Sequence, residues 1–129
     1  MTKCILSIAV AAVALSGTLR AAEPETVLIT LHPKAGAEQE LADVVARHFQ
    51  IAQRLELLQP GAVHTTLRGA DEADRPYLIE ILTWRDASVP DHAPKEILTI
   101  WSEMSRLVEP HAGRPGLDIM PMRTITREK

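Results

Sequence analysis

Two histidines are the side chains of this sequence best placed to move a proton. His92 precedes a helical stretch, where it either lies at the mouth of a pocket and acts as an acid–base group or a hydrogen-bond donor, or is simply exposed to water. His48 lies on the apolar side of an earlier helical stretch, where it is either a buried residue with one partner or a pocket residue that faces Trp101. Both are therefore candidate catalytic residues.

Glu80 is a third candidate, because it is a carboxylate in the middle of an extended apolar run. A buried carboxylate is costly unless it is paired. We therefore expect Glu80 to meet Arg68 or Arg123 on a neighbouring strand, or to lie at a subunit interface. An unpaired Glu80 in a pocket would instead accept a proton from a substrate.

The other histidines are His32, His64 and His111, and they form no metal-binding pattern. No two histidines stand at ligand spacing on one helix, and none is flanked by a suitable carboxylate pattern. The sequence also lacks a glycine-rich phosphate loop, a nucleophile elbow and a pair of catalytic carboxylates. It predicts neither a metal site nor a bound cofactor.

Aromatic residues are few, and three of them are candidates to line a binding site: Trp101, Trp84 and Phe49. Trp101 is either a core residue or the flat wall of a site for an aromatic molecule. These three side chains are the expected substrate-binding residues.

The order of patterns that must position these residues is strand, helix, strand, strand, helix, strand. The predicted strands are Thr26–His32, Ala62–Arg68, Pro76–Trp84 and Leu117–Ile125, and the predicted helices are Ala37–Leu58 and Pro94–Glu109. This order predicts an α+β domain in which two right-handed helical crossovers pack on one face of a four-stranded sheet.

The predicted helices are amphipathic, with apolar residues at spacings of three and four. The stripe of the second helix comprises Ile97, Leu98, Trp101, Met104, Leu107 and Val108. The strand Pro76–Trp84, in contrast, is apolar on both faces, with Ile79 and Ile81 on one and Leu78 and Leu82 on the other. Because helices cover only one face of the sheet, the second face needs a cover of its own. We expect a homodimer that pairs these faces about a two-fold axis.

The first 22 residues predict a secretory signal peptide, and residues 23–129 the folded domain. Lys3 precedes a short apolar run, and small residues lead to Ala21 and Ala22, where a peptidase could cut. The run is too short to span a bilayer. We therefore expect a periplasmic or secreted protein that is not held in the membrane after cleavage.

Cleavage at this site changes the charge and the redox chemistry of the chain. It leaves 12 of the 14 basic residues against 17 acidic ones, a net charge of −5, which argues against nucleic acid as a partner. The only cysteine, Cys4, is removed as well, so the mature chain uses neither disulfides nor thiol chemistry.

Several short motifs mark the ends of the predicted strands and the second predicted helix. They are Pro33-Lys34-Ala35-Gly36 after the first strand, Trp84-Arg85-Asp86, His92, Ile97-Leu98-Thr99-Ile100-Trp101 and Gly113-Arg114-Pro115-Gly116. In these features the chain resembles the antibiotic-biosynthesis-monooxygenase-like family of dimeric α+β-barrel domains over roughly residues 25–126. The resemblance implies a ferredoxin-like βαββαβ sheet that pairs with its twin to form a barrel. It also implies a mostly apolar pocket between the sheet and the helices.

The family includes cofactor-independent oxygenases of quinols and polyketide aromatics, haem-degrading oxygenases and domains without a demonstrated reaction. The sequence contains no asparagine, which the haem-degrading branch uses with a tryptophan and a histidine. We therefore expect an exported domain that binds a small apolar or aromatic molecule and is either a cofactor-independent monooxygenase of a phenol or quinol or a non-catalytic binding or assembly module.

Overall fold

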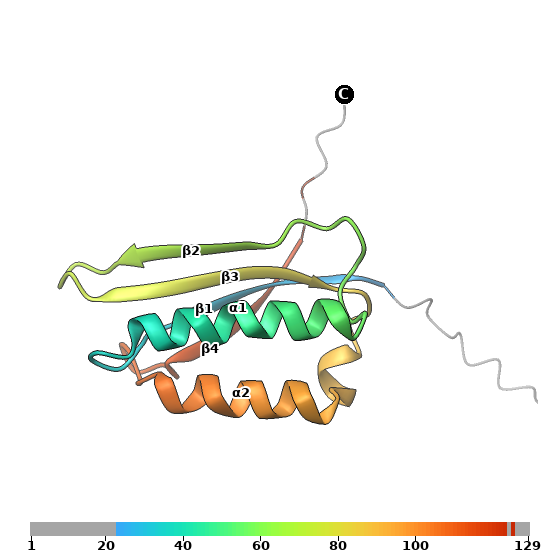
Figure 1. Cartoon of the computed structure of the whole chain (residues 1–129). Helices are drawn as coiled ribbons and strands as arrows, with labels where there is room; N and C mark the ends of the chain where they lie inside the picture. Colours follow the sequence, from blue (N-terminus) through green and yellow to red (C-terminus); the bar gives the residue numbers. More distant parts are fainter. Residues whose placement is uncertain (1–22, 124, 126–129) are drawn as a thin grey trace, which may run out of the picture.

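The computed structural model describes residues 23–123 and 125, which form a four-stranded antiparallel sheet with two helices on one face (Figure 1). The elements are β1 (Glu25–Leu31), α1 (Glu38–Arg54), β2 (Thr65–Ala70), β3 (Pro76–Trp84), the 3-10 turn η1 (Val89–His92), α2 (Lys95–Leu107) and β4 (Leu117–Met122). This confirms the predicted α+β, ferredoxin-like order. The predicted signal peptide lies outside the described residues.

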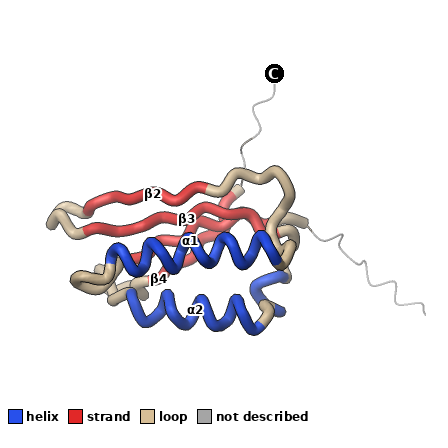
Figure 2. The backbone as a smooth tube through the Cα atoms, viewed as in Figure 1, coloured by secondary structure: helices blue, strands red, loops and turns tan. Residues whose placement is uncertain are grey.

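The strand order in the sheet is β2-β3-β1-β4, and every neighbouring pair is antiparallel. Each helix therefore links two strands that run in the same direction without being neighbours. Figure 2 shows that both helices lie on the same side of the sheet.

The register of β3 decides which of its side chains face the helices. Glu80 pairs with Ile29 of β1 and with Thr66 of β2. Alternate residues of β3 from Leu78 to Trp84 are buried, whereas the residues between them are only partly buried. Glu80 therefore points into the layer between sheet and helices, among apolar side chains.

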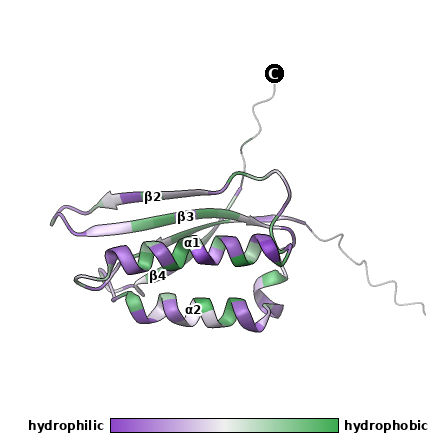
Figure 3. Cartoon of the chain, in the orientation of Figure 1, coloured by the Kyte–Doolittle hydropathy of each residue, from purple (hydrophilic) through white to green (hydrophobic). Residues whose placement is uncertain are grey.

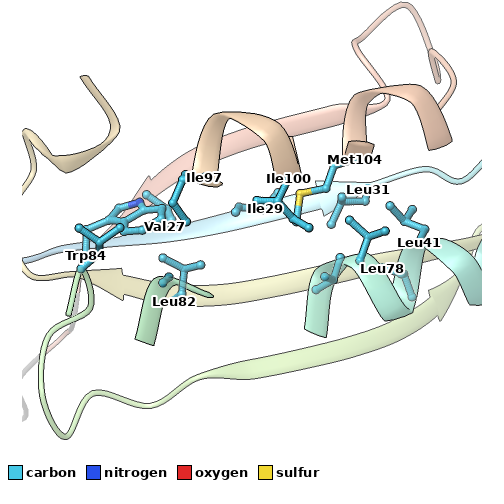
Figure 4. Close-up of a cluster of buried hydrophobic side chains, with 14 of the residues drawn as sticks. Val27, Ile29, Leu31, Leu41, Leu78, Leu82, Trp84, Ile97, Ile100 and Met104 are labelled. Carbon is cyan, nitrogen blue, oxygen red and sulfur yellow. The ribbon is translucent and has the colours of Figure 1, made fainter. Parts of the chain in front are cut away.

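The core fills this layer, and Figure 4 shows how side chains from β1, β3 and α2 meet in it. Its largest fully buried apolar side chains are Leu31, Leu41, Val44, Val45, Leu82, Ile97, Ile100 and Met104. Both helices carry apolar and polar residues in alternating patches (Figure 3), as expected for helices with one buried side. Leu98 is 53% exposed, so its placement on the buried stripe of the second helix was wrong.

The first helix ends at Arg54, so the prediction that it continues to Leu58 was wrong. Glu56 has a φ of 57°, outside the helical region, and turns the chain. Beyond it the chain runs beside the end of β3, where the Arg85 N–H donates to the Leu57 carbonyl and the Gln59 N–H to the Thr83 carbonyl. Leu57, which is 6% exposed, joins the core in an extended segment.

The predicted boundaries of three strands also differ from the observed ones, most at the start of β2 and at the end of β4, while β1 is shifted by one residue and β2 extends to Ala70. β2 begins at Thr65 rather than Ala62, because Gly61 lies in a turn with a φ of 73°. β4 ends at Met122, which pairs with Thr26 near the start of β1, so β1 offers almost no further pairing partners.

Among the described residues, no helix has the length and apolar character needed to cross a membrane.

Within residues 23–123, no helix or loop covers the face of the sheet away from the helices. Ile79 and Ile81 point from β3 toward this face, beside Leu28 of β1. Leu67 and Met120, also on this face, are 51% and 41% exposed. We call this surface the open face. The pairing of two open faces in a dimer stays a prediction.

Candidate functional site

A chain of three hydrogen bonds crosses the layer between the helices and the sheet. The Trp101 indole Nε1 donates to His48 Nε2 at 3.0 Å, and His48 Nδ1 lies 2.8 Å from Glu80 Oε1. The second carboxylate oxygen, Oε2, lies 3.1 Å from His64 Nε2. We call Trp101, His48, Glu80 and His64 the buried network. It links α2, α1, β3 and the loop before β2.

The bond from Trp101 determines the tautomer of His48. An indole N–H can only donate, so His48 Nε2 must accept and carry no hydrogen. The hydrogen of the neutral ring is then on Nδ1, which donates to the Glu80 carboxylate. Both nitrogens of His48 are occupied, and its side chain has no exposed surface.

Glu80 is the most deeply buried charged side chain of this network, with 1% of its side chain exposed. Burying an unpaired carboxylate costs several kcal/mol. Here the carboxylate accepts from both imidazoles and from no arginine, so the predicted pairing with Arg68 or Arg123 was wrong. Arg68 instead binds Glu38 at the start of α1, because β2 places its side chain at the edge of the sheet.

His64 is the network member closest to solvent, with 20% of its side chain exposed. Its ring stacks on Phe49 of α1, with centroids 3.7 Å apart and planes 9° from parallel. Nε2 is held by Glu80, whereas Nδ1 makes no hydrogen bond to any described residue. Since no buried side-chain nitrogen or oxygen in the described part lacks a partner, Nδ1 reaches solvent.

The open side of His64 faces a cavity of about 420 Å³ between the end of α1 and the following loop. We call it the histidine cavity. Its polar lining includes Gln59, Glu56 and Arg85, and the Arg85 guanidinium donates to the Glu56 carbonyl at 3.0 Å. Phe49 is its aromatic wall.

A second cavity, of about 400 Å³, lies on the other side of the network between α2 and strands β1 and β4. Trp84 and Trp101 both line it, with ring centroids 6.3 Å apart and planes at 79°. We call it the tryptophan cavity. Its other lining residues are mostly apolar, among them Met104 and Ile119, and its polar lining includes Glu25, Asp91 and Ser105.

The predicted site residues therefore do not share one cavity. The two tryptophans line one cavity and Phe49 lines the other, while His48 and Glu80 lie in the wall between them. His92 is exposed on η1 and lines neither cavity.

A separate cluster lies at the opposite end of the sheet, beside a cavity of about 580 Å³ with mixed polar lining. There the rings of His32 and His111 stack with centroids 4.1 Å apart, and His111 Nδ1 lies 4.0 Å from an Asp71 oxygen. Burial lowers the pKa of His32 from its ordinary 6.5, and His111 and Arg75 lower it further, whereas Asp71 opposes them. Hydrogen bonds from the backbone N–H groups of Arg75 and Ala73 lower the pKa of Asp71.

The part of the chain that the structure describes holds no group of three or more histidine, cysteine, aspartate and glutamate side chains that could bind a metal ion. The side chains of the site themselves offer proton exchange at His64 and aromatic contact at Phe49, Trp84 and Trp101.

His64 was not among the candidate residues of the sequence. It was assigned to the interior of a strand, and no spacing links it to Glu80. The register of β2 and β3, with Thr66 opposite Glu80, puts His64 on the same face and diagonal to the carboxylate. Periodicity alone does not contain this register.

Comparison with known proteins supports the fold. No protein-family model and no curated protein sequence matches the chain. Among solved structures, SnoaB from Streptomyces nogalater, a cofactor-independent oxygenase, superposes with a TM-score of 0.59 at 23% identity, covering 82% of this chain and 97% of its own. A candidate antibiotic biosynthesis monooxygenase from Bacteroides thetaiotaomicron has a TM-score of 0.58 at 12% identity, covering 81% and 91%.

A third similar structure is a dimeric ferredoxin-like protein of unknown function from Jannaschia sp., with a TM-score of 0.55 at 15% identity, covering 78% of this chain and 99% of its own. At these identities the comparisons concern the fold. They agree with the resemblance and with the ferredoxin-like architecture expected from the sequence.

Proposed function

We propose that this chain, which has the ferredoxin-like fold of antibiotic-biosynthesis-monooxygenase-like proteins, binds a small aromatic or apolar molecule in the tryptophan cavity. The observation that carries the proposal is that the only two tryptophans, from β3 and α2, meet edge to face in the wall of one cavity. Its volume of about 400 Å³ is within the usual range for small-molecule sites, about 300–1,000 Å³.

The lining of this cavity favours an aromatic ring over a polar ligand. The indole N–H of Trp101 is already used by His48, so Trp101 offers a ligand its ring and no hydrogen. The described polar groups near a ligand are the carboxylates of Glu25 and Asp91 and the hydroxyl of Ser105. A ligand with one or two hydroxyl groups on an aromatic ring fits this combination.

The proposed reaction is the oxygenation of a phenol or quinol without a cofactor, supported by the shared fold with an oxygenase. A base removes the hydroxyl proton, and the electron-rich anion then passes an electron to dioxygen in a dry cavity. For a quinol, the substrate supplies all the electrons: one oxygen atom enters the product, a hydroxyquinone, and the other leaves as water.

A non-catalytic binding module is the second candidate, and one observation favours it. In the part of the chain that the structure describes, no histidine lines the tryptophan cavity, and His48 behind its wall has both ring nitrogens bonded. A ligand in this cavity would then be held without being turned over.

The protein is also proposed to be exported and to act as a homodimer. Export is supported by the signal-like pattern of residues 1–22, and intact-mass measurement after expression in a bacterium would reject it by finding the Met1 end retained. The dimer is supported by the uncovered apolar side chains of the open face and by the dimeric ferredoxin-like neighbour.

Titration of tryptophan fluorescence with phenols, quinols and porphyrins tests the binding proposal, and an oxygen electrode tests turnover. We expect saturable quenching by phenols or quinols with a Kd in the micromolar range, about −8 kcal/mol. Ile119→Phe, which narrows the tryptophan cavity, should weaken binding at least tenfold, whereas Leu98→Phe on the exposed side of α2 should not. Absence of any quenching would reject the tryptophan site. Quenching without oxygen uptake would favour the non-catalytic module.

A further inference from the structure

We infer that His64 is a proton acceptor in a second binding site, the histidine cavity, and that this site takes a compound with a weakly acidic hydroxyl group on an sp² carbon. This inference rests on the proposed function only for the class of compound. It concerns a different cavity and a residue outside the predicted set.

The His64 ring is held from two directions. Phe49 stacks on its face, with centroids 3.7 Å apart, and Glu80 binds its Nε2 at 3.1 Å. Glu80 is in turn oriented by His48, whose tautomer is set by Trp101. The buried network thus positions one exposed ring edge, and a reactive group must be held in this way to act efficiently.

The two histidines of the network differ in the state of their nitrogens. A histidine that serves only the core has both nitrogens bonded, as His48 has. His64 has one bonded nitrogen and one that reaches solvent beside a cavity. When Nε2 donates its hydrogen to the Glu80 carboxylate, Nδ1 carries the free lone pair and is the atom that can accept a proton.

The proton transfer is balanced within the site. The hydroxyl O–H bond of the ligand breaks, its electron pair stays on oxygen, and a new N–H bond forms at His64 Nδ1. The products are an oxyanion and an imidazolium. The imidazolium lies next to the Glu80 carboxylate. The negative charge of this carboxylate stabilises the positive charge of the ring, and Glu80 itself takes up no proton.

The other charged groups that line the cavity are Arg85 and Glu56. The Arg85 guanidinium spends one N–H on the Glu56 carbonyl, and its remaining N–H groups and charge favour an anionic ligand. Glu56 is exposed and opposes an anion from the water side. Glu80 lies behind His64 and acts on the ligand through that ring.

The test uses 4-nitrophenol, whose phenolate is yellow and whose neutral form is not. At a pH where the free probe is largely neutral, we expect the protein-bound probe to be largely phenolate. His64→Phe keeps a ring to stack on Phe49. It should lower the ratio of phenolate to neutral probe in the bound state by about tenfold or more, which corresponds to a rise of one unit or more in the pKa of the bound probe. His92→Gln, an exposed histidine outside the cavity, should change nothing.

Two further variants separate this proton-accepting role from a structural one. Glu80→Gln should lower the phenolate fraction of the bound probe without abolishing binding, because the imidazolium loses its counter-charge. Val63→Phe, an exposed residue that lines the histidine cavity, should weaken binding of the probe, whereas Ile119→Phe in the tryptophan cavity should not.

The inference is overturned if 4-nitrophenol does not bind at millimolar concentration, binds in its neutral form, or ionises equally in His64→Phe. Quenching of tryptophan fluorescence that only Ile119→Phe weakens, with no phenolate formed, would leave the tryptophan site standing and reject the histidine site. Phenolate formation that depends on His64, without any quenching of tryptophan fluorescence, would support the histidine site and reject the tryptophan site.

Discussion

The indole Nε1 of Trp101 lies 3.0 Å from Nε2 of His48 and joins α2 to α1 inside the core. Since the indole can only donate, this bond places the hydrogen of His48 on the nitrogen that faces Glu80. Trp101 therefore has two roles, as a wall of the tryptophan cavity and as the start of the buried network. In the proposed site His48 is a positioning residue, because both of its ring nitrogens are already bonded.

The first prediction concerns the Trp101 hydrogen bond. Trp101→Phe keeps an aromatic ring but leaves His48 Nε2 without a donor in the core. An unsatisfied buried polar group costs about 1–3 kcal/mol, so the free energy of unfolding in urea should fall by that amount more than in Trp84→Phe. Trp84 is the matched control, because its side chain makes no hydrogen bond in the described part of the chain. Equal losses in the two variants would show that the bond contributes nothing.

The second prediction concerns the His48–Glu80 pair. Removing one partner of a buried hydrogen bond leaves the other group unsatisfied at a cost of about 1–3 kcal/mol, and more where that group is charged, so Glu80→Leu and His48→Leu should each destabilise the protein. The double variant should lose less unfolding free energy than the sum of the two single losses, because it leaves neither the carboxylate nor the imidazole without its partner in the core. A double-mutant cycle on urea unfolding measures this coupling, and strict additivity would contradict it.

The third prediction concerns the open face. Ile79→Glu should dissociate the proposed dimer, because it would bury an unpaired charge at a cost of several kcal/mol in the interface. Sedimentation equilibrium at micromolar concentration should report twice the monomer mass for the wild type and the monomer mass for the variant. Leu98→Glu, on an exposed helix position, is the control and should stay dimeric. A monomeric wild type would reject the dimer.

The fourth prediction concerns pH. The pKa of His32 in the folded protein is lowered from 6.5, chiefly by burial. The unfolded chain therefore binds this proton at a higher pH than the folded chain does. The stabilisation that comes from this shift in the His32 pKa is fully present above pH 6.5. It falls as the pH drops from 6.5 toward the pKa of the folded state, and it does not change further below that pKa.

His32→Phe keeps the stacking on His111 and removes this titration. Urea unfolding at a series of pH values below 7 should show a shallower fall in stability for His32→Phe than for the wild type. His92→Gln, which lies outside the cluster, should follow the wild type. Identical slopes for all three proteins would contradict the assignment.

Much of this architecture is already implied by residue order. Apolar residues on both faces of β3 and three-and-four spacing in the helices predict a sheet with helices on one face and a second apolar face that needs a cover of its own. The need of Glu80 for a partner follows from its apolar neighbours. These features are local: they depend on the period of each element and on the solvation of one side chain. They were therefore open to inference before any contact was known.

The partners in the site depend on tertiary structure. Glu80 contacts His48 and His64 rather than an arginine. The packing of α1 brings His48 to Glu80 across a separation of 32 positions in the sequence, and the strand register brings His64 to Glu80 across a separation of 16. Tertiary structure also determines where α1 ends. The chain after α1 runs beside the end of β3, and this places Leu57 in the core. Local periodicity cannot specify register, because sliding a strand by two residues preserves every face while changing every partner.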